Sequence, residues 1–325
     1  MLADYTLKNG IPIIDLGRLS EPNGLQLTAD DFRAAYSEIG FGAVVNHGIS
    51  NTLLADLFNA SKKFHALPLE TKMQIALSSQ HRGYIPINTS TDVNSKLADV
   101  KQPNLSESFI IMREDASDSI PVKTGAYLAG PNQWPALSGF REILTEANEQ
   151  FSIVARKLLE VTCVALGVKP SRLMPVFSCP TSWLRLLHYP PQPSSKDLYG
   201  SAPHTDFGCL TLLAQDNVAG LQVQTSNGDW LDVEPDREAL IVNVGDMLHQ
   251  WSNGILKSTP HRVVNRSGLE RYSCAFFFDP YVDTIISPLE ECIANEQSSR
   301  FAPVHFGEFL REQLESSYRQ HQKQH

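Results

Sequence analysis

The chain has 325 residues, of which 42% are hydrophobic, and this is enough apolar sequence for a large packed core. Its 36 acidic residues outnumber 27 basic ones and give a formal net charge of -9, which argues against nucleic acid or anionic membrane as a partner. The five cysteines are odd in number and form no Cys-x-x-Cys pair, as is typical of reduced thiols. With no secretory signal pattern and no apolar run of membrane-spanning length, we expect a cytoplasmic protein that needs no obligate protein partner.

The first part of the chain alternates between short apolar runs and helical patterns. Two apolar runs predict buried strands and two helically spaced segments predict helices: residues 11–16 and 41–48 for the strands, and 28–39 and 53–64 for the helices. We therefore expect an N-terminal α/β segment over residues 1–125. Residues 85–103 are polar and aperiodic, which is typical of either a surface loop or a mobile lid.

The second part, residues 126–325, begins with apolar residues on one helical stripe from Phe140 to Leu166, followed by Gly167. This pattern predicts a long scaffold helix. Short runs separated by turns then predict strands between about residues 180 and 280, and residues 304–318 predict a closing helix. The strands are 183–189, 209–214, 220–224, 239–244, 261–264 and 272–278. Many short strands favour a barrel or jelly roll, flanked by helices and forming one compact unit with the N-terminal segment.

His204-Thr205-Asp206 and a distant His261 form the candidate metal site. Residues two apart on a strand point to the same face, so His204 and Asp206 can hold one ion from a single strand, and the intervening strands can return His261 from a facing part of the barrel. Two imidazoles and one carboxylate suit mononuclear non-haem Fe(II), whereas structural zinc prefers four ligands, usually including cysteine. We expect these three residues to be both the metal ligands and the catalytic centre.

Two simpler explanations compete with this interpretation. An isolated His-x-Asp occurs often by chance without binding metal. His249 is an alternative third ligand, but it stands just before the turn-forming Ser252-Asn253-Gly254, and we prefer His261.

Arg271 and Ser273 follow ten and twelve residues after His261 and share one strand face. Together they can hold a carboxylate through the guanidinium fork and the hydroxyl. By the same alternation Ala275 and Phe277 should line the cavity, while Cys274, Phe276 and Phe278 should pack against an outer layer. Phe277 is therefore either part of a substrate wall or ordinary barrel core.

These residues resemble the isopenicillin N synthase-like family of Fe(II)- and 2-oxoglutarate-dependent dioxygenases, over roughly residues 11–309. The segments that carry the resemblance are 204–213, 243–246, 258–263 and Arg271-x-Ser273, with Asn46-His47-Gly48, Arg82-Gly83-Tyr84 and His188-Tyr189-Pro190 upstream. The resemblance implies a double-stranded β-helix (jelly-roll, cupin-like) core. It also implies Fe(II) as the metal, 2-oxoglutarate as co-substrate and O2 as oxidant, with hydroxylation, desaturation or cyclisation of a small-molecule substrate and release of succinate and CO2.

The resemblance further implies roles for individual residues. Arg271, Ser273 and Tyr189 would bind the co-substrate carboxylate, although Leu187 stands where many plant members have an asparagine. Tyr84 would either form the pocket mouth and contact substrate, or merely pack. Two other functions stay open: an Fe(II) oxidase or cyclase that uses Arg-x-Ser on its own substrate's carboxylate, and a non-catalytic metal-containing jelly-roll binding module.

Overall fold

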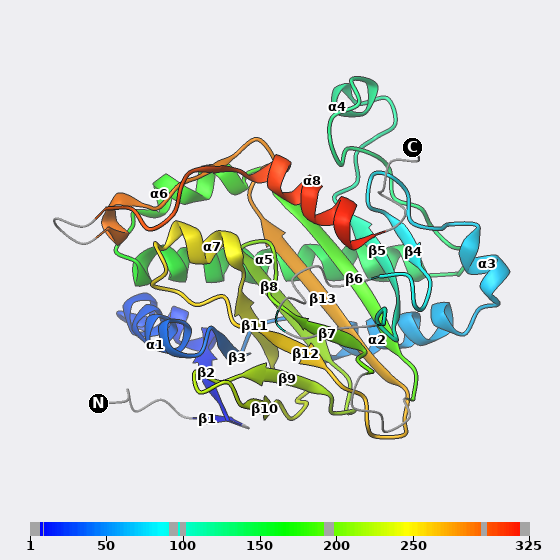
Figure 1. Ribbon diagram of the computed structural model, residues 1–325, viewed down its shortest axis with the longest axis horizontal. Helices are drawn as coiled ribbons and strands as arrows, with labels where there is room; N and C mark the ends of the chain where they lie inside the picture. Colours follow the sequence, from blue (N-terminus) through cyan, green and yellow to red (C-terminus); the bar gives the residue numbers. More distant parts are fainter. Residues whose placement is uncertain are drawn as a thin grey trace.

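The computed structural model describes residues 7–8, 10–90, 97, 102–191, 198–293 and 298–318. Its centre is two β-sheets that face each other, with helices packed behind the larger one (Figure 1). No helix in the described ranges is both long and apolar enough to cross a membrane.

The larger sheet combines strands from both ends of the chain. Apart from β2 and β3, which run parallel, its neighbouring strands are antiparallel. Because β3 pairs with β11, the N-terminal segment extends the sheet of the second part. Its nine described strands, in spatial order, are β1 (Leu7–Lys8), β2 (Ile11–Asp15), β3 (Phe41–Val45), β11 (Leu240–Val244), β8 (Leu210–Gln215), β13 (Arg271–Asp279), β6 (Thr181–Tyr189), β5 (Glu107–Met112) and β4 (Gly83–Ile85).

The smaller sheet completes the jelly roll and is not joined to the larger one into a closed barrel. In spatial order its strands are β10 (Trp230–Asp232), β9 (Leu221–Gln224), β12 (His261–Val263) and β7 (Ser201–His204), and a separate ribbon pairs β14 (Ile285–Ile286) with β15 (Val304–His305). The predicted jelly-roll class with flanking helices is thus confirmed.

Helices support the sheets and carry the chain around them. They are α1 (Gly24–Glu38), α2 (Asn51–His65), α3 (Leu69–Met73), α4 (Ile120–Lys123), α5 (Phe140–Ala165), α6 (Pro170–Leu173), α7 (Asp246–Trp251) and α8 (Phe306–Ser317). Helices α2 and α5 lie behind the larger sheet, α8 crosses in front of it, and α4 sits on a lobe that projects from the body (Figure 1).

The long helix α5 shows why this scaffold forms from the sequence. Its apolar residues recur at intervals of three and four, so one face is continuously buried. Gly167 follows its end with a φ of 71°, a left-handed conformation that glycine adopts at little cost. Phe151 from this face packs on Phe276 of β13, with ring centroids 5.7 Å apart.

The two faces of β13 meet different environments, as predicted. Cys274, Phe276 and Phe278 are fully buried in the core shared with the helices. Ala275 and Phe277 face the space between the two sheets and line its cavity. The alternation of a strand therefore separates scaffold residues from cavity residues.

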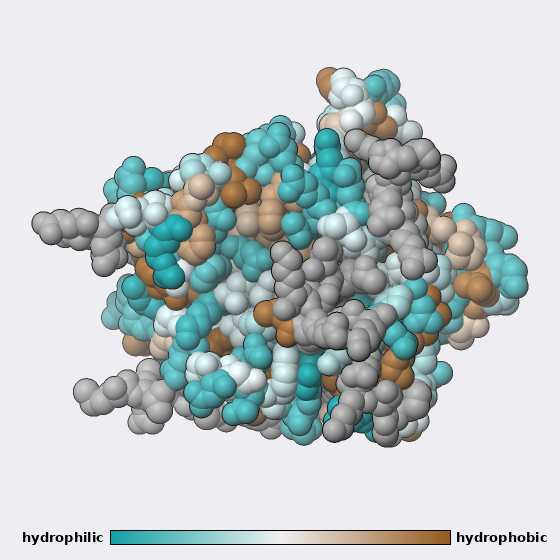
Figure 2. All heavy atoms as spheres, viewed as in Figure 1, coloured by the Kyte–Doolittle hydropathy of each residue, from teal (hydrophilic) through white to brown (hydrophobic). Residues whose placement is uncertain are grey.

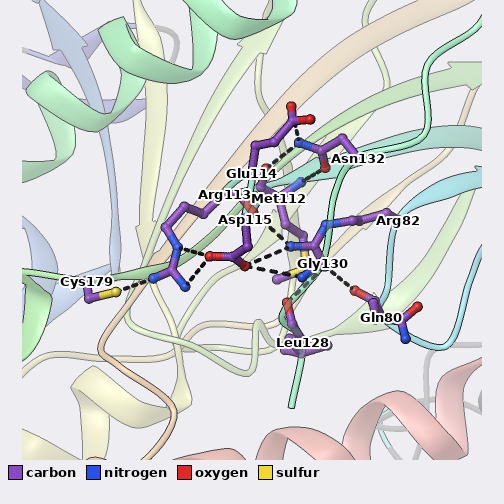
Figure 3. Close-up of polar contacts among 10 residues, drawn as sticks. All are labelled: Gln80, Arg82, Met112, Arg113, Glu114, Asp115, Leu128, Gly130, Asn132 and Cys179. Carbon is purple, nitrogen blue, oxygen red and sulfur yellow. Dashed lines mark hydrogen bonds and ion pairs between the residues drawn. The ribbon is translucent and has the colours of Figure 1, made fainter. Parts of the chain in front are cut away.

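Arg82, from the Arg82-Gly83-Tyr84 landmark, anchors the projecting lobe (Figure 3). Its side chain is 1% exposed, and its terminal nitrogens donate to the carbonyls of Gln80, Leu128 and Arg113. Asp115 lies 3.7 Å from the same guanidinium. Since a buried cation must be compensated by several acceptors, this arginine holds both ends of the lobe on the sheet.

Most predicted elements occur within a few residues of their expected bounds, but several strands were not predicted. Among them are β4, β5 and β10, while β7 was expected only through the strand placed at His204 and Asp206, and it ends at His204. Of these, β5 is buried along its whole length, and the others have only three or four residues. Within the predicted loop or lid at 85–103, residues 91–96 and 98–101 lie outside the described residues, and β4 reaches Ile85.

Candidate active site

A cavity that is partly open to solvent lies between the two sheets, and its empty space, with the part open to solvent included, is about 560 Å³. Residues from five strands of the larger sheet and three of the smaller sheet line it. Polar residues among them are Arg185, Tyr189, Ser201, His204, Asp206, Thr211, Asn243, His261, Arg271 and Ser273. Eight residues were singled out from the sequence as metal, co-substrate or substrate contacts. Seven of them line this cavity, and the exception is Tyr84.

His204 and His261 lie directly opposite each other on the neighbouring strands β7 and β12. The imidazole centroids are 4.3 Å apart. The expected geometry was wrong in two details. His261 comes from an adjacent strand of the same sheet, not a facing one. Strand β7 ends at His204, so Asp206 lies in the turn that follows it.

Backbone carbonyls orient both imidazoles. Nδ1 of His204 lies 2.7 Å from the carbonyl oxygen of Ala202, and Nδ1 of His261 lies 3.2 Å from that of Thr259. A carbonyl only accepts, so each Nδ1 carries the proton and Nε2 keeps its lone pair. These Nε2 atoms lie 3.8 Å and 3.7 Å from Oδ1 of Asp206, which leaves three donor atoms facing one point.

Asp206 is held by its other carboxylate oxygen. Oδ2 accepts hydrogen bonds from the Thr211 hydroxyl and the Asn243 amide, both at 2.6 Å. Burial acts to raise the pKa of this carboxyl, but its attraction to His261 and His204 in their protonated forms and the two hydrogen bonds outweigh that effect, so the pKa lies below its usual value. The side chain is therefore an anion with Oδ1 free to face the histidines.

The turn after Asp206 depends on a close approach to Asp279. Oδ1 of Asp279 accepts a hydrogen bond from the Cys209 amide at 2.5 Å. A Cβ atom at Gly208 would lie only 1.9 Å from the same oxygen, so only glycine fits there.

Asp246 joins the two segments that carry the metal-site residues. Its carboxylate accepts from Ser258 at 2.6 Å and from Thr205 at 3.2 Å, and its amide donates to the Asp206 carbonyl at 2.8 Å. Burial raises the pKa of Asp246, although the hydrogen bonds from Ser258 and Thr205 act in the opposite direction. Asp246 thus braces the turns on both sides of the site.

We expect Asp246→Ala to weaken Fe(II) binding by roughly 10- to 100-fold, because ligand orientation would lose its outer support. The loss of a buried hydrogen-bonded group should also lower the free energy of unfolding by about 1–3 kcal/mol. Metal titration and denaturant unfolding would measure both effects. Ser258→Ala removes only one of the bonds and should have a smaller effect; an Asp246 variant with wild-type metal affinity would contradict this bracing role.

Arg271 and Ser273 present unsatisfied polar atoms to the same cavity. Arg271 is fully buried, and it donates to the Gln215 side chain at 2.7 Å and to the Val218 carbonyl at 3.2 Å. Its Nη1 atom, Ser273 Oγ and Gln215 Nε2 have no hydrogen-bond partner among the described residues. No carboxylate among the described residues forms an ion pair with Arg271. Such a buried cation is costly, which fits a site built for a carboxylate ligand.

Tyr189 lies against the Arg271 guanidinium, which stands over its ring at 4.8 Å from the centroid. The two residues are register partners on β6 and β13. Leu187, where many plant members carry asparagine, also lines the cavity and offers no polar contact.

The structure keeps two other candidates away from the site. Tyr84 does not line the cavity: it is 1% exposed on β4, and its hydroxyl donates to Glu107. It lies opposite Phe109, on the face of the sheet that packs against the helices, so of the two alternatives for Tyr84, pocket mouth or packing, the structure supports packing. His249 is directed by its Nδ1 to the Leu256 carbonyl and is not part of the metal-site group.

Several residues that build the site had no role assigned from the sequence. Asn243 and Asp246 belong to the segment 243–246 that carries part of the family resemblance. Their spacing alone, however, did not indicate which groups they would hydrogen-bond. Thr211 and Gln215 lie on β8, where period-two alternation alone could have directed them to the cavity face.

The chain is similar to known protein families and to individual proteins of known activity. A family model described as the non-haem dioxygenase in morphine synthesis N-terminal region matches residues 11–137, and the 2OG-Fe(II) oxygenase superfamily model matches residues 180–280. The 2-oxoglutarate-Fe(II) type oxidoreductase hxnY of Emericella nidulans is 37% identical over 290 residues, which cover 86% of this chain and 81% of that protein. The chain belongs to the 2-oxoglutarate- and Fe(II)-dependent oxygenases.

Other members of the family agree in sequence and in structure. The 2-oxoglutarate-dependent dioxygenase citB of Monascus ruber is 36% identical, with 86% of this chain and 88% of that protein covered. A full-length Neurospora crassa protein, solved in complex with alpha-KG and thymine, superimposes with a TM-score of 0.84 at 28% identity and covers 96% of this chain and 99% of that one. JOX2 in complex with 2OG, Fe and JA gives a TM-score of 0.78 at 27% identity, with 95% and 89% covered.

Membership in the 2-oxoglutarate- and Fe(II)-dependent oxygenases confirms the resemblance drawn from the motifs. The protein is an oxidoreductase that oxidises a small molecule with Fe(II), 2-oxoglutarate and O2. Such a dioxygenase is favoured over both the oxidase or cyclase that dispenses with 2-oxoglutarate and the non-catalytic binding module.

Proposed function

We propose that His204, Asp206 and His261 hold the Fe(II) and that Arg271 and Ser273 bind the far carboxylate of 2-oxoglutarate. The observation that carries this proposal is the pairing of three convergent donor atoms with a buried, unsatisfied guanidinium and hydroxyl in one cavity. The donor set of two imidazoles and one carboxylate is the one that leaves coordination positions open on Fe(II).

The residues that line the cavity then have distinct roles. When bound, iron would bring O2, the oxidant, together with 2-oxoglutarate: two of the four electrons that O2 takes up would come from the conversion of 2-oxoglutarate to succinate and CO2, and the other two from a nearby substrate bond. Asp206 would neutralise part of the metal charge, and Thr211 and Asn243 fix the orientation of its carboxylate. The Tyr189 ring lies under the Arg271 guanidinium and helps to position it, and Phe277 forms part of the apolar wall of the cavity.

An oxygen-free titration tests this assignment. Adding Fe(II) and then 2-oxoglutarate to the protein should produce a visible metal-to-oxo-acid absorption band, and admitting oxygen should release succinate. Absence of the band at saturating concentrations of both would contradict the proposed co-substrate site. A band in His261→Ala equal to that of the wild type would contradict the proposed ligand set.

We also propose one compact unit, a cytoplasmic location and independence from an obligate protein partner. The β3–β11 pairing and the edge contact of Phe41 with His261, at 5.3 Å between centroids, support joint folding of residues 1–125 and 126–325. All five cysteines are free of disulfides, in keeping with a reducing compartment. The face drawn in Figure 2 is mainly hydrophilic, with apolar residues in small separate groups.

A further inference from the structure

A second guanidinium lines the cavity, and neither the metal nor 2-oxoglutarate accounts for it. Arg185 lies on β6, four positions before Tyr189 and opposite Ala275 of β13. Arg271 lies opposite Tyr189, so the two arginines start roughly 13 Å apart along the sheet. A five-carbon dicarboxylic acid held by Arg271 and by the metal leaves the Arg185 end of the cavity for another molecule.

The hydrogen-bond partners of Arg185 are neutral. Its Nε donates to the Ser108 hydroxyl at 3.0 Å, and its Nη1 donates to the Tyr318 hydroxyl at 3.2 Å. Across the described part of the chain, no carboxylate pairs with this guanidinium and its Nη2 makes no hydrogen bond. Arg185 thus lines the cavity with no counter-ion among the described residues, and an anionic ligand in the cavity would supply the missing interaction.

Apolar and aromatic surface adjoins this charge. Phe277 lines the cavity and stacks on Trp183, with centroids 5.0 Å apart and an interplanar angle of 28°. Leu187 and Ala275 line the wall between Arg185 and Ser273. A flat apolar wall beside one cationic group is complementary to a molecule with a planar body and one carboxylate.

From this arrangement we infer that the substrate is a small carboxylic acid with an aromatic or otherwise planar apolar body, whose carboxylate pairs with Arg185. The inference rests on the proposed roles of the metal triad and Arg271, since these fill the opposite side of the cavity. Arg185 is then a specificity-determining residue: it places the apolar body along Phe277, next to the metal side of the cavity.

Matched acids and amides test the charge directly. The probes are phenylacetate, cinnamate and 1-naphthoate, each compared with its primary amide. Binding to protein loaded with Fe(II) and 2-oxoglutarate without oxygen is read from the change in the visible band. In the wild type we expect at least one acid to bind about tenfold more tightly than its amide. In Arg185→Gln that preference should fall below about twofold, and Arg185→Lys should restore part of it.

A structural role of Arg185 is separated by Tyr318→Phe. This variant removes the hydroxyl that links Arg185 to the end of α8 but leaves the charge, so it should keep the preference for acids. Equal binding of acid and amide in every wild-type pair, no binding of any acid, or a preference that survives in Arg185→Gln would overturn the inference.

Failure of this inference is distinguishable from failure of the proposed function. The absorption band before any probe is added reports iron and 2-oxoglutarate binding alone. A normal band without acid preference overturns only the role of Arg185. Where the band is absent, the melting temperature of the iron-free protein with each acid and amide still reads the Arg185 preference.

Discussion

Replacing Asp206 by asparagine is expected to reduce iron-dependent turnover to less than about 1% of the wild-type rate. The amide oxygen can accept the hydrogen bonds from Thr211 and Asn243 that Oδ2 accepts now. The neutral amide group would then face Nε2 of His204 and His261 in place of an anionic oxygen. Iron content after equilibrium dialysis, and succinate formed per minute, measure the two consequences.

The asparagine variant should lose metal without losing its fold. Its volume and its buried hydrogen bonds are retained, so the melting temperature of the iron-free protein should stay close to that of the iron-free wild type. Asp232→Asn is the matched control, because Asp232 is an exposed carboxylate on β10. Retention of full iron content in the Asp206 variant would remove this residue from the ligand set.

Arg271→Ala is expected to weaken 2-oxoglutarate binding by about 2 kcal/mol, roughly 30-fold, or more. The buried guanidinium has an unsatisfied Nη1 beside the unsatisfied Ser273 hydroxyl, and alanine offers neither a charge nor a donor. A titration of the visible band at saturating Fe(II), without oxygen, gives the dissociation constant directly.

A ligand that lacks the far carboxylate provides the control for Arg271→Ala. 2-Oxovalerate keeps the oxo-acid end of 2-oxoglutarate but lacks the far carboxylate. It should bind the wild type weakly and should lose little further affinity in Arg271→Ala. An equal loss for both ligands would indicate general damage to the cavity, and an unchanged 2-oxoglutarate constant would contradict the carboxylate role.

Local sequence patterns were sufficient for most of the fold. The helix α5 and the strands β6, β8, β11 and β13 follow from hydrophobic periodicity, since a 3.6-residue or two-residue repeat specifies both the element and its buried side. Strand β5 was not predicted, because all six of its residues are buried and no alternation of apolar and polar residues marks it as a strand. Strand β7 has only four residues and contains a proline, which weakens any strand pattern.

Tyr84 and Arg185 show where inference about the site failed. Tyr84 was a candidate substrate contact because it follows a family landmark, yet β4 pairs with β5 so that its ring enters the core. Arg185 was not singled out at all, although it lies on a predicted strand two and four residues before Leu187 and Tyr189. Alternation would have placed it on the same face, but only the structure reveals that its partners there are neutral.

By itself the sequence was enough to predict an Fe(II) site, because the types and spacing of His204, Asp206 and His261 limit which metal and which reaction class they suit. It also determined which side of β13 faces the cavity, since alternation is a local property of a strand. Tertiary structure alone decided that His261 pairs beside His204, that Asn243 and Thr211 orient Asp206, and that Arg185 meets no internal counter-ion among the described residues. Those facts depend on strand register and on contacts between distant segments, and neither is encoded in any short stretch of the chain.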